Sequence, residues 1–242
     1  MPLRAPKVHR DTVHHPLFAR FYARLSVAAD SGLGIADYRA ELLSGLSGRI
    51  IEIGAGNGLN FPHYPAAVSE VVAIEPERVL RQLAVTSARN ADVPVDVVPG
   101  AAEALPVKSE AFDGAVVSLV LCSVRDVARA LSEISRVLRP GGELRFLEHG
   151  RAPGRFMAGT QRALDRSVWP LLFGGCHTAR EPLAAMERAG FEIGAYRSLY
   201  IPGKGLRLPS SFTVLGVARR PFAPDGPATG SESTDGAGLA ES

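Results

Sequence analysis

One segment of the chain has the residue types and spacing to bind a cofactor that lacks phosphates. Glu52-Ile-Gly54-Ala-Gly56-Asn-Gly58 is rich in glycine, which lets a ligand approach the backbone closely. The dinucleotide fingerprint is G-x-G-x-x-G, whereas the spacing here is G-x-G-x-G. An acidic residue at position 52 would repel a pyrophosphate but could attract an ammonium group. The segment therefore favours a cofactor that carries an amino acid and an adenosine.

Two further features stand at the ends of the next two predicted strands. Glu75, followed by Pro76, is placed to accept hydrogen bonds from both hydroxyls of a ribose. The loop 99–106, Pro-Gly-Ala-Ala-Glu-Ala-Leu-Pro, is placed to cover an adenine ring. A solvated carboxylate is the alternative for Glu75 alone. The occurrence of all three features in this order at consecutive strand ends is far more specific than any one of them.

Polar residues later in the chain could handle a second molecule. His149 directly follows the fifth predicted strand, where an imidazole could act as a base, bind an acceptor or make a structural hydrogen bond. Cys176 and His177 could line the same pocket, or form a turn with a buried thiol. Together with Cys122 these residue types bind zinc, but no pair has ligand spacing. We therefore expect no metal site.

Alternating strands and helices must position these residues. The predicted strands cover 49–53, 71–74, 95–98, part of 112–121, 143–147, 191–200 and 212–218; the predicted helices cover 16–29, 35–46, 78–90, 127–138, 156–168 and 179–189. Such alternation indicates a mostly parallel sheet covered on both faces, and the last two strands suggest an antiparallel hairpin at its end. Ligands of these sheets bind outside the carboxyl ends of the strands, where the residues above stand.

Composition sets the limits of this interpretation. The chain has 242 residues, and 46% of them are hydrophobic, which suits a globular core. Its net charge of +2 indicates no nucleic-acid partner. We expect a flexible arm at 1–13, one domain at 14–220 and a disordered tail at 221–242. Two cysteines fit a reducing compartment. Without an apolar run of about 18 residues or a signal peptide, we expect a cytoplasmic protein that does not insert stably into membranes.

Over about residues 14–220 the sequence resembles the class I S-adenosylmethionine-dependent methyltransferases. Within that class it is similar to the methyltransferase-like family that includes the thiol S-methyltransferases. The resemblance rests on the segments 52–65, 119–124 (Leu-Val-Leu-Cys-Ser-Val), 136–142 (Arg-Val-Leu-Arg-Pro-Gly-Gly), 148–149 (Glu-His), 169–176 (Trp-Pro-Leu-Leu-Phe-Gly-Gly-Cys) and 180–181 (Arg-Glu). It implies an α/β fold, a Rossmann-like seven-stranded mostly parallel sheet with an antiparallel last strand and helices on both faces.

The resemblance also implies roles for particular residues. S-adenosylmethionine would be the cofactor and S-adenosylhomocysteine its product. The residues expected to bind the cofactor are Glu52, Gly54, Ala55, Gly56, Gly58, Asn60, Glu75, Pro76, Gly100, Ala101, Ala102, Leu119 and Leu121. His149 is the candidate catalytic residue, and the acceptor pocket is expected to include Phe18, Tyr22, Trp169 and His177. The helix at 16–29 would cover the cleft as a lid, although its aromatic spacing equally fits a plain core helix.

Three departures from the family pattern qualify these expectations. Asn57 stands where the family commonly has threonine, Ala101 stands where many relatives have aspartate, and the hydrophobic membrane-associating segment of the animal proteins is missing. The expected activity is methylation of a small, partly apolar acceptor, with a thiol favoured and the enzyme a monomer or homodimer. The alternatives are N-methylation of amines or phospholipid head groups, C- or O-methylation of quinones or phenols, and a degenerate cofactor-binding module without turnover.

Overall fold

The computed structural model describes residues 16–205 and 207–222. The predicted arm at 1–13 and nearly all of the predicted tail at 221–242 lie outside these residues, so they stay predictions. Within the described residues, no helix is both long and apolar enough to cross a membrane.

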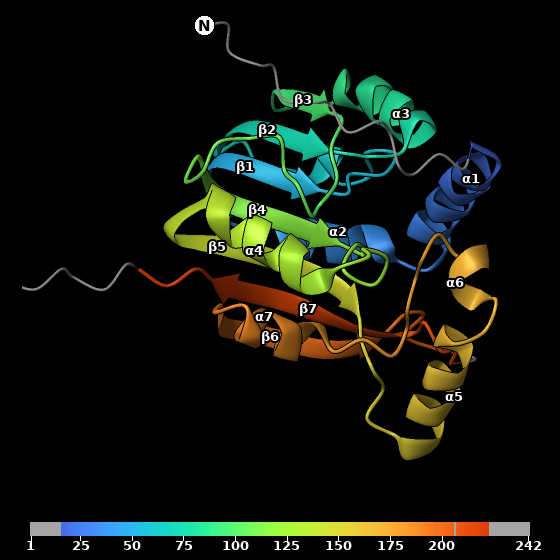
Figure 1. Cartoon of the computed structure of the whole chain (residues 1–242). Coiled ribbons are helices and arrows are strands. Elements are labelled where there is room, and N and C mark those ends of the chain that lie inside the picture. Colours follow the sequence, from blue (N-terminus) through green and yellow to red (C-terminus); the bar gives the residue numbers. More distant parts are fainter. Residues whose placement is uncertain (1–15, 206, 223–242) are drawn as a thin grey trace, which may run out of the picture.

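Seven strands form one sheet in the order β3-β2-β1-β4-β5-β7-β6 (Figure 1). The strands are β1 (Gly48–Ile53), β2 (Val68–Ile74), β3 (Val95–Val98), β4 (Phe112–Ser118), β5 (Leu138–His149), β6 (Glu192–Tyr200) and β7 (Phe212–Arg219). The first five pair in parallel, whereas β7 lies antiparallel between β5 and β6. The predicted mostly parallel sheet with an antiparallel last strand is confirmed.

Helices cover both faces of this sheet. They are α1 (Pro16–Gly32), α2 (Ile35–Leu43), the 3-10 turn η1 (Phe61–His63), α3 (Arg78–Ala88), α4 (Val127–Val137), α5 (Arg155–Asp165), α6 (Trp169–Leu172) and α7 (Pro182–Arg188). The local sequence explains why two of these helices begin where they do. Glu77 accepts a hydrogen bond from the backbone N–H of Leu80 and so caps α3, and Asp126 caps α4 in the same way.

The core consists of two apolar layers, one on each face of the sheet. Because successive side chains of a strand point to opposite faces, Ile51 and Ile50 of β1 belong to different layers. Ile51 shares its layer with Leu131 of α4 and Met186 of α7. Ile50 shares the other layer with Leu43 of α2. The helices α2, α4 and α7 are therefore held by the burial of one apolar face each.

Several predicted boundaries were wrong, including those of the fifth strand and of two helices. The fifth strand begins at Leu138 rather than 143, because Leu138 is already extended and pairs with Phe112 before the register shifts. The helix predicted over 179–189 begins at Pro182, which lacks an N–H and fits the first helical turn. The helix predicted over 156–168 ends at Asp165, and α6 follows as a separate turn.

The core contacts of α4 can be tested with a matched pair of leucine substitutions. Leu131 is fully buried, whereas Leu83 on α3 is 41% exposed. We expect Leu131→Ala to lower the free energy of unfolding by about 3 kcal/mol and Leu83→Ala by less than about 1 kcal/mol, because only the first leaves a cavity. Denaturant unfolding measures both values, and equal losses would contradict the assignment of α4 to the core.

Candidate active site

The carboxyl ends of adjacent strands bring the predicted site residues to one edge of the sheet. Since β2, β1, β4 and β5 are neighbours, the residues that follow them line up in that order (Figure 1). Glu75 follows β2, Gly54 follows β1, Leu119 follows β4, and His149 ends β5. This is the edge at which parallel sheets of α/β proteins bind their ligands.

Only the middle glycine of the loop after β1 faces open space. Gly54, Gly56 and Gly58 all have positive φ, of 69°, 58° and 81°. A Cβ at Gly54 would lie 2.6 Å from Val120 Cγ2, and one at Gly58 would lie 2.7 Å from Phe61 Cε2. A Cβ at Gly56 would meet nothing within 4 Å. The two outer glycines thus allow tight packing, and Gly56 leaves its backbone open to a ligand.

The carboxylate of Glu75 lies against this loop. Its Oε2 accepts a hydrogen bond from the Gly56 N–H at 2.7 Å, and its Oε1 accepts one from the Glu77 N–H at 2.8 Å. Burial raises the pKa of Glu75 to about 7, while the same two N–H groups limit the rise. Pro76, next in the chain, is half-buried. The loop and the carboxylate therefore form one hydrogen-bonded unit, and their predicted roles in cofactor binding stay predictions.

The predicted adenine loop is compact. Ala101 is half-buried and pairs with Ala104 in a short antiparallel bridge, whereas Ala102 packs into the core. A Cβ at Gly100 would lie 2.8 Å from Pro106 Cδ, so only glycine fits there without a shift. Glu133 of α4 accepts the N–H of Leu105 and fixes the end of the loop.

The loop after β4 is held in a strained conformation. Leu119 has a φ of 60°, which is rare for a residue other than glycine and costs about 1–3 kcal/mol. Its N–H donates to Leu147 O of β5 at 2.7 Å. Glu148 Oε1 accepts the N–H groups of Val120 and Leu121 at 2.8 and 3.0 Å. Such over-determined strain is typical of functional sites.

Glu52 is buried and bonded rather than open to the loop. It is 2% exposed, and its carboxylate accepts from Asn60 Nδ2 at 2.9 Å and from the Tyr64 hydroxyl at 2.7 Å. Burial raises the pKa of Glu52 to about 7, and these hydrogen bonds oppose the rise. The contacts of Glu52 are those of a residue that positions Asn60.

Arg39 of α2 extends this network, although no sequence pattern identified it as a site residue. Its guanidinium donates to Asn60 Oδ1 at 2.8 Å, to Asp30 Oδ1 at 2.7 Å and to Ser118 Oγ at 3.2 Å. The side chain is buried among the apolar positions of α2. An arginine on the apolar face of a predicted helix was the available signal, because buried arginines are paired.

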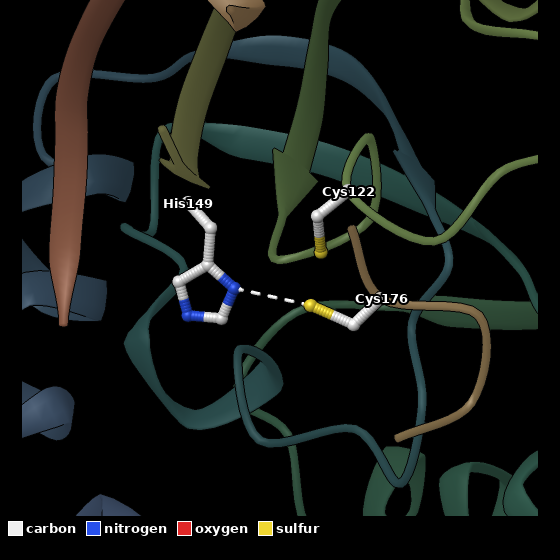
Figure 2. Close-up of side chains that lie close together, drawn as sticks. All are labelled: Cys122, His149 and Cys176. Carbon is white, nitrogen blue, oxygen red and sulfur yellow. Dashed lines mark hydrogen bonds between the residues drawn. The ribbon is translucent and has the colours of Figure 1, made fainter. Parts of the chain in front are cut away.

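A second group of side chains lies beside the end of β5 (Figure 2). Cys122, His149 and Cys176 have ligand atoms that all lie within 4.8 Å of one another, and Cys176 Sγ is 3.6 Å from His149 Nδ1. Burial lowers the pKa of His149, but Cys122 and Glu148 outweigh it and leave the pKa above its ordinary value. Contact with Cys176 and burial raise the pKa of the Cys122 thiol.

The segment that carries Cys176 is fastened to the loop after β4. The His177 N–H donates to Cys122 O at 2.8 Å, and the Arg180 guanidinium donates to Leu121 O. The His177 imidazole binds back to Gly175 O at 2.7 Å. His177 is therefore engaged within its own turn, and its predicted place in the acceptor pocket stays a prediction.

Two polar residues of α5, one buried and one half-buried, hold the same segment, and sequence reasoning missed both. Gln161 accepts the Ala152 N–H at 2.9 Å and contacts the carbonyl oxygens of Gly150, Thr178 and Pro209 at 2.8–3.1 Å. Asp165 accepts the backbone N–H groups at 178 and 179. Both residues bind partners that are distant in the sequence, so no local sequence pattern marks them.

Helix α1 contacts the glycine loop, and the lid role expected for it stays a prediction. Asn57 Nδ2 donates to Ser26 Oγ at 3.3 Å, which ties the glycine loop to α1. Burial raises the pKa of Tyr22 to about 12; Arg39 opposes the rise, and Cys122 and Glu75 add to it. The role of Tyr22 in the acceptor pocket stays a prediction. The side chain of Phe18 lies outside the described residues.

Trp169 combines a packing role with an unused donor. Its ring stacks on Phe173 with centroids 4.0 Å apart, and its buried Nε1 has no partner among the described residues.

A cavity of about 130 Å³ lies beside the end of β5 and is lined by Leu121, Cys122, Val127, His149, Arg180, Glu181, Pro182, Ala185 and Arg188.

Comparisons with known proteins identify the family. A family model described as a methyltransferase domain matches residues 51–146. The chain is 36% identical over 186 residues to the thiol S-methyltransferase TMT1A of Homo sapiens, which covers 72% of this chain and 75% of that protein. The chain belongs to the class I S-adenosylmethionine-dependent methyltransferases. The methyltransferase also matches the ubiquinone/menaquinone biosynthesis C-methyltransferase UbiE of Syntrophotalea carbinolica, 32% identical over 66% of this chain and 70% of that one.

A solved structure agrees with the fold. The methyltransferase matches a possible histamine N-methyltransferase of Thermotoga maritima with a TM-score of 0.63 and 24% identity, over 84% of this chain and 98% of that one. The predicted fold, enzyme class and cofactor are confirmed: the methyltransferase acts on small molecules and uses S-adenosylmethionine. The open face of Gly56 beside the buried Glu75 fits the cofactor's methionine and ribose portions.

The buried Glu52 should make the stability of the methyltransferase depend on pH. The pKa of Glu52 is about 7 in the folded protein and 4.5 in the unfolded chain. As the pH rises, the unfolded chain therefore loses this proton before the folded protein does. Between about pH 4.5 and pH 7 the free energy of unfolding should therefore fall, by on the order of 3 kcal/mol from this group.

Glu52→Gln tests this dependence, because its amide oxygen still accepts a hydrogen bond from Asn60 or Tyr64. We expect a smaller loss of stability from about pH 5 to about pH 8 than in the parent protein. Glu75, shifted in the same direction, supplies a remaining slope. Urea unfolding at both pH values measures the effect, and identical slopes for the two proteins would contradict it.

Gly54→Ala and Gly56→Ala separate packing from cofactor binding. Both substitutions place a Cβ at positive φ, at a cost of about 1–2 kcal/mol, but only the first also forces a clash, with Val120. We expect Gly54→Ala to be the less stable variant. We expect Gly56→Ala to stay folded and to raise the Kd for S-adenosylhomocysteine at least ~10-fold. Titration calorimetry measures this, and unchanged affinity in folded Gly56→Ala would refute the placement.

Proposed function

We propose that the methyltransferase methylates the sulfur of a small, partly apolar thiol. The observation that carries the proposal is the position of His149, which is half-buried at the end of β5 and lines a cavity together with the apolar Leu121. The 36% identity to a thiol S-methyltransferase over three quarters of that protein supports the acceptor class.

Bound S-adenosylmethionine supplies a methyl group on a positively charged sulfur, so transfer needs an aligned nucleophile and a dry site. The residues of this chain provide both. Gly56 and Glu75 hold the cofactor at the ends of β1 and β2, and His149 contacts the acceptor at the end of β5. We assign the exclusion of water to α1, which contacts the glycine loop through Ser26 and Asn57. Alignment and dehydration of this kind supply several kcal/mol toward a displacement reaction.

Methylation of a quinone carbon is the second candidate. The 32% identity to a C-methyltransferase of quinone biosynthesis, over 70% of that protein, favours it. Both candidates share the cofactor site and differ at the acceptor end. The identity of the acceptor atom therefore depends on the residues around His149, and an acceptor panel distinguishes the two.

Turnover with small apolar thiols, phenols, amines and a demethylated quinone tests the proposal. We expect thiols to give the highest kcat/KM. We expect His149→Ala to lower that value by about 100-fold or more, because the acceptor loses its contact, while affinity for S-adenosylhomocysteine stays unchanged. His63→Ala, a histidine of η1 outside this cluster, is the matched control. Preference for the quinone, or full thiol turnover by His149→Ala, would overturn the proposal.

A further inference from the structure

Three potential metal ligands come together from distant parts of the chain. Cys122 lies in the loop after β4, His149 ends β5, and Cys176 follows α6. Figure 2 shows the two thiols and the imidazole pointing into one shared space. Their ligand atoms all lie within 4.8 Å of one another.

The separations fit a tetrahedral ion. Bonds of about 2.3 Å to sulfur and about 2.0 Å to nitrogen, at an angle of about 109°, place the two ligand atoms about 3.5 Å apart. The observed distance from Cys176 Sγ to His149 Nδ1 is 3.6 Å. Two sulfur ligands of one ion lie about 3.8 Å apart, so the 4.8 Å limit requires a contraction of no more than about 1 Å.

The donor chemistry selects a thiophilic ion. Two thiolates and one imidazole suit Zn²⁺, whereas Mg²⁺ and Ca²⁺ prefer oxygen ligands. Cys122 and Cys176 are 2% and 8% exposed, a setting in which isolated thiolates would be costly. Two thiolates, one neutral imidazole and one divalent cation sum to no net charge. The cluster can therefore be ionised and buried only with the ion in place.

The surroundings meet the other requirements of a metal site. The backbones of Cys122 and Cys176 are braced by the hydrogen bond from the His177 N–H to Cys122 O at 2.8 Å. Ser123 Oγ lies 3.5 Å from Cys122 Sγ, where its hydroxyl can donate to a thiolate. The cavity of about 130 Å³ lined by Cys122 and His149 gives an ion a route to the cluster.

We propose that Cys122, His149 and Cys176 bind one zinc-type divalent ion and leave its fourth coordination position open. Three protein ligands with one open position are the arrangement of catalytic rather than structural zinc sites. The ligand that we assign to the open position is the sulfur of the acceptor, an assignment that rests on the proposed thiol methylation. A thiol that coordinates such an ion is deprotonated outright, so its proton passes to solvent and the nucleophile is already a thiolate.

The full-length protein, stripped with a chelator under reducing conditions and titrated with Zn²⁺ and then with Co²⁺, tests the site. We expect one ion per chain and a thiolate-to-cobalt charge-transfer absorption. Cys122→Ser, Cys176→Ser and His149→Asn should each weaken Zn²⁺ binding ~100-fold or more. His63→Asn should bind Zn²⁺ as the parent does. Affinity for S-adenosylhomocysteine checks that each variant is folded. If a variant does not fold, the cobalt spectrum of the parent protein still tests whether thiolates bind the ion.

The outcomes separate this inference from the proposed function. Zn²⁺ binding below one ion per chain, binding that survives all three substitutions, or a cobalt spectrum without thiolate ligation would overturn the metal site. So would a Cys122–Cys176 disulfide forming in preference to ion binding in the same protein without reductant. Thiol turnover that depends on His149 but is unaffected by Zn²⁺ removal would overturn the open-position role and leave the proposed function intact. Stoichiometric Zn²⁺ binding without thiol turnover would overturn the proposed function and leave the metal site intact.

Discussion

A single buried carboxylate organises the acceptor end of the molecule. Glu148 sits next to the end of β5, and its Oε1 accepts the N–H groups of Val120 and Leu121 in the loop after β4. Because the side chain is fully buried, losing these bonds would leave uncompensated polar groups in the interior. This contact fixes the loop against the strand, and with it the position of Cys122 relative to His149. One residue thus joins the end of β5 to the loop that follows β4.

The cofactor end relies on a separate network. Arg39 of α2, Asn60 and Glu52 form a continuous chain of hydrogen bonds that runs from the end of β1 to Ser118 at the end of β4. Asp30 near the end of α1 joins the same arginine. One guanidinium therefore couples the two N-terminal helices to the sheet edge. In low-dielectric surroundings such fully paired networks define a single arrangement of the groups that they connect.

Local patterns explain what the sequence could predict. The positions of Gly56 and Glu75 followed from residue types at strand ends, because parallel strands bring their carboxyl ends together. The roles of Arg39 and Gln161 did not follow, since each binds partners far away in the chain. The proximity of Cys122 and Cys176 did not follow from their spacing for a related reason, since they meet only through the packing of two loops. Strand boundaries near Leu138 were missed because pairing, not local composition, sets where that strand begins.

The left-handed backbone of Leu119 lowers the stability of the fold, but the residue places a leucine side chain at the end of β4. Glycine adopts a φ of 60° without steric cost, so a glycine there would relieve the strain. The molecule instead keeps a bulky apolar side chain directly after β4, at the carboxyl edge of the sheet. Thermostabilising replacements chosen on backbone conformation alone would favour this position first. They would remove an apolar side chain from the edge of the sheet where the candidate site residues gather, so a ranking by stability alone would act against the site.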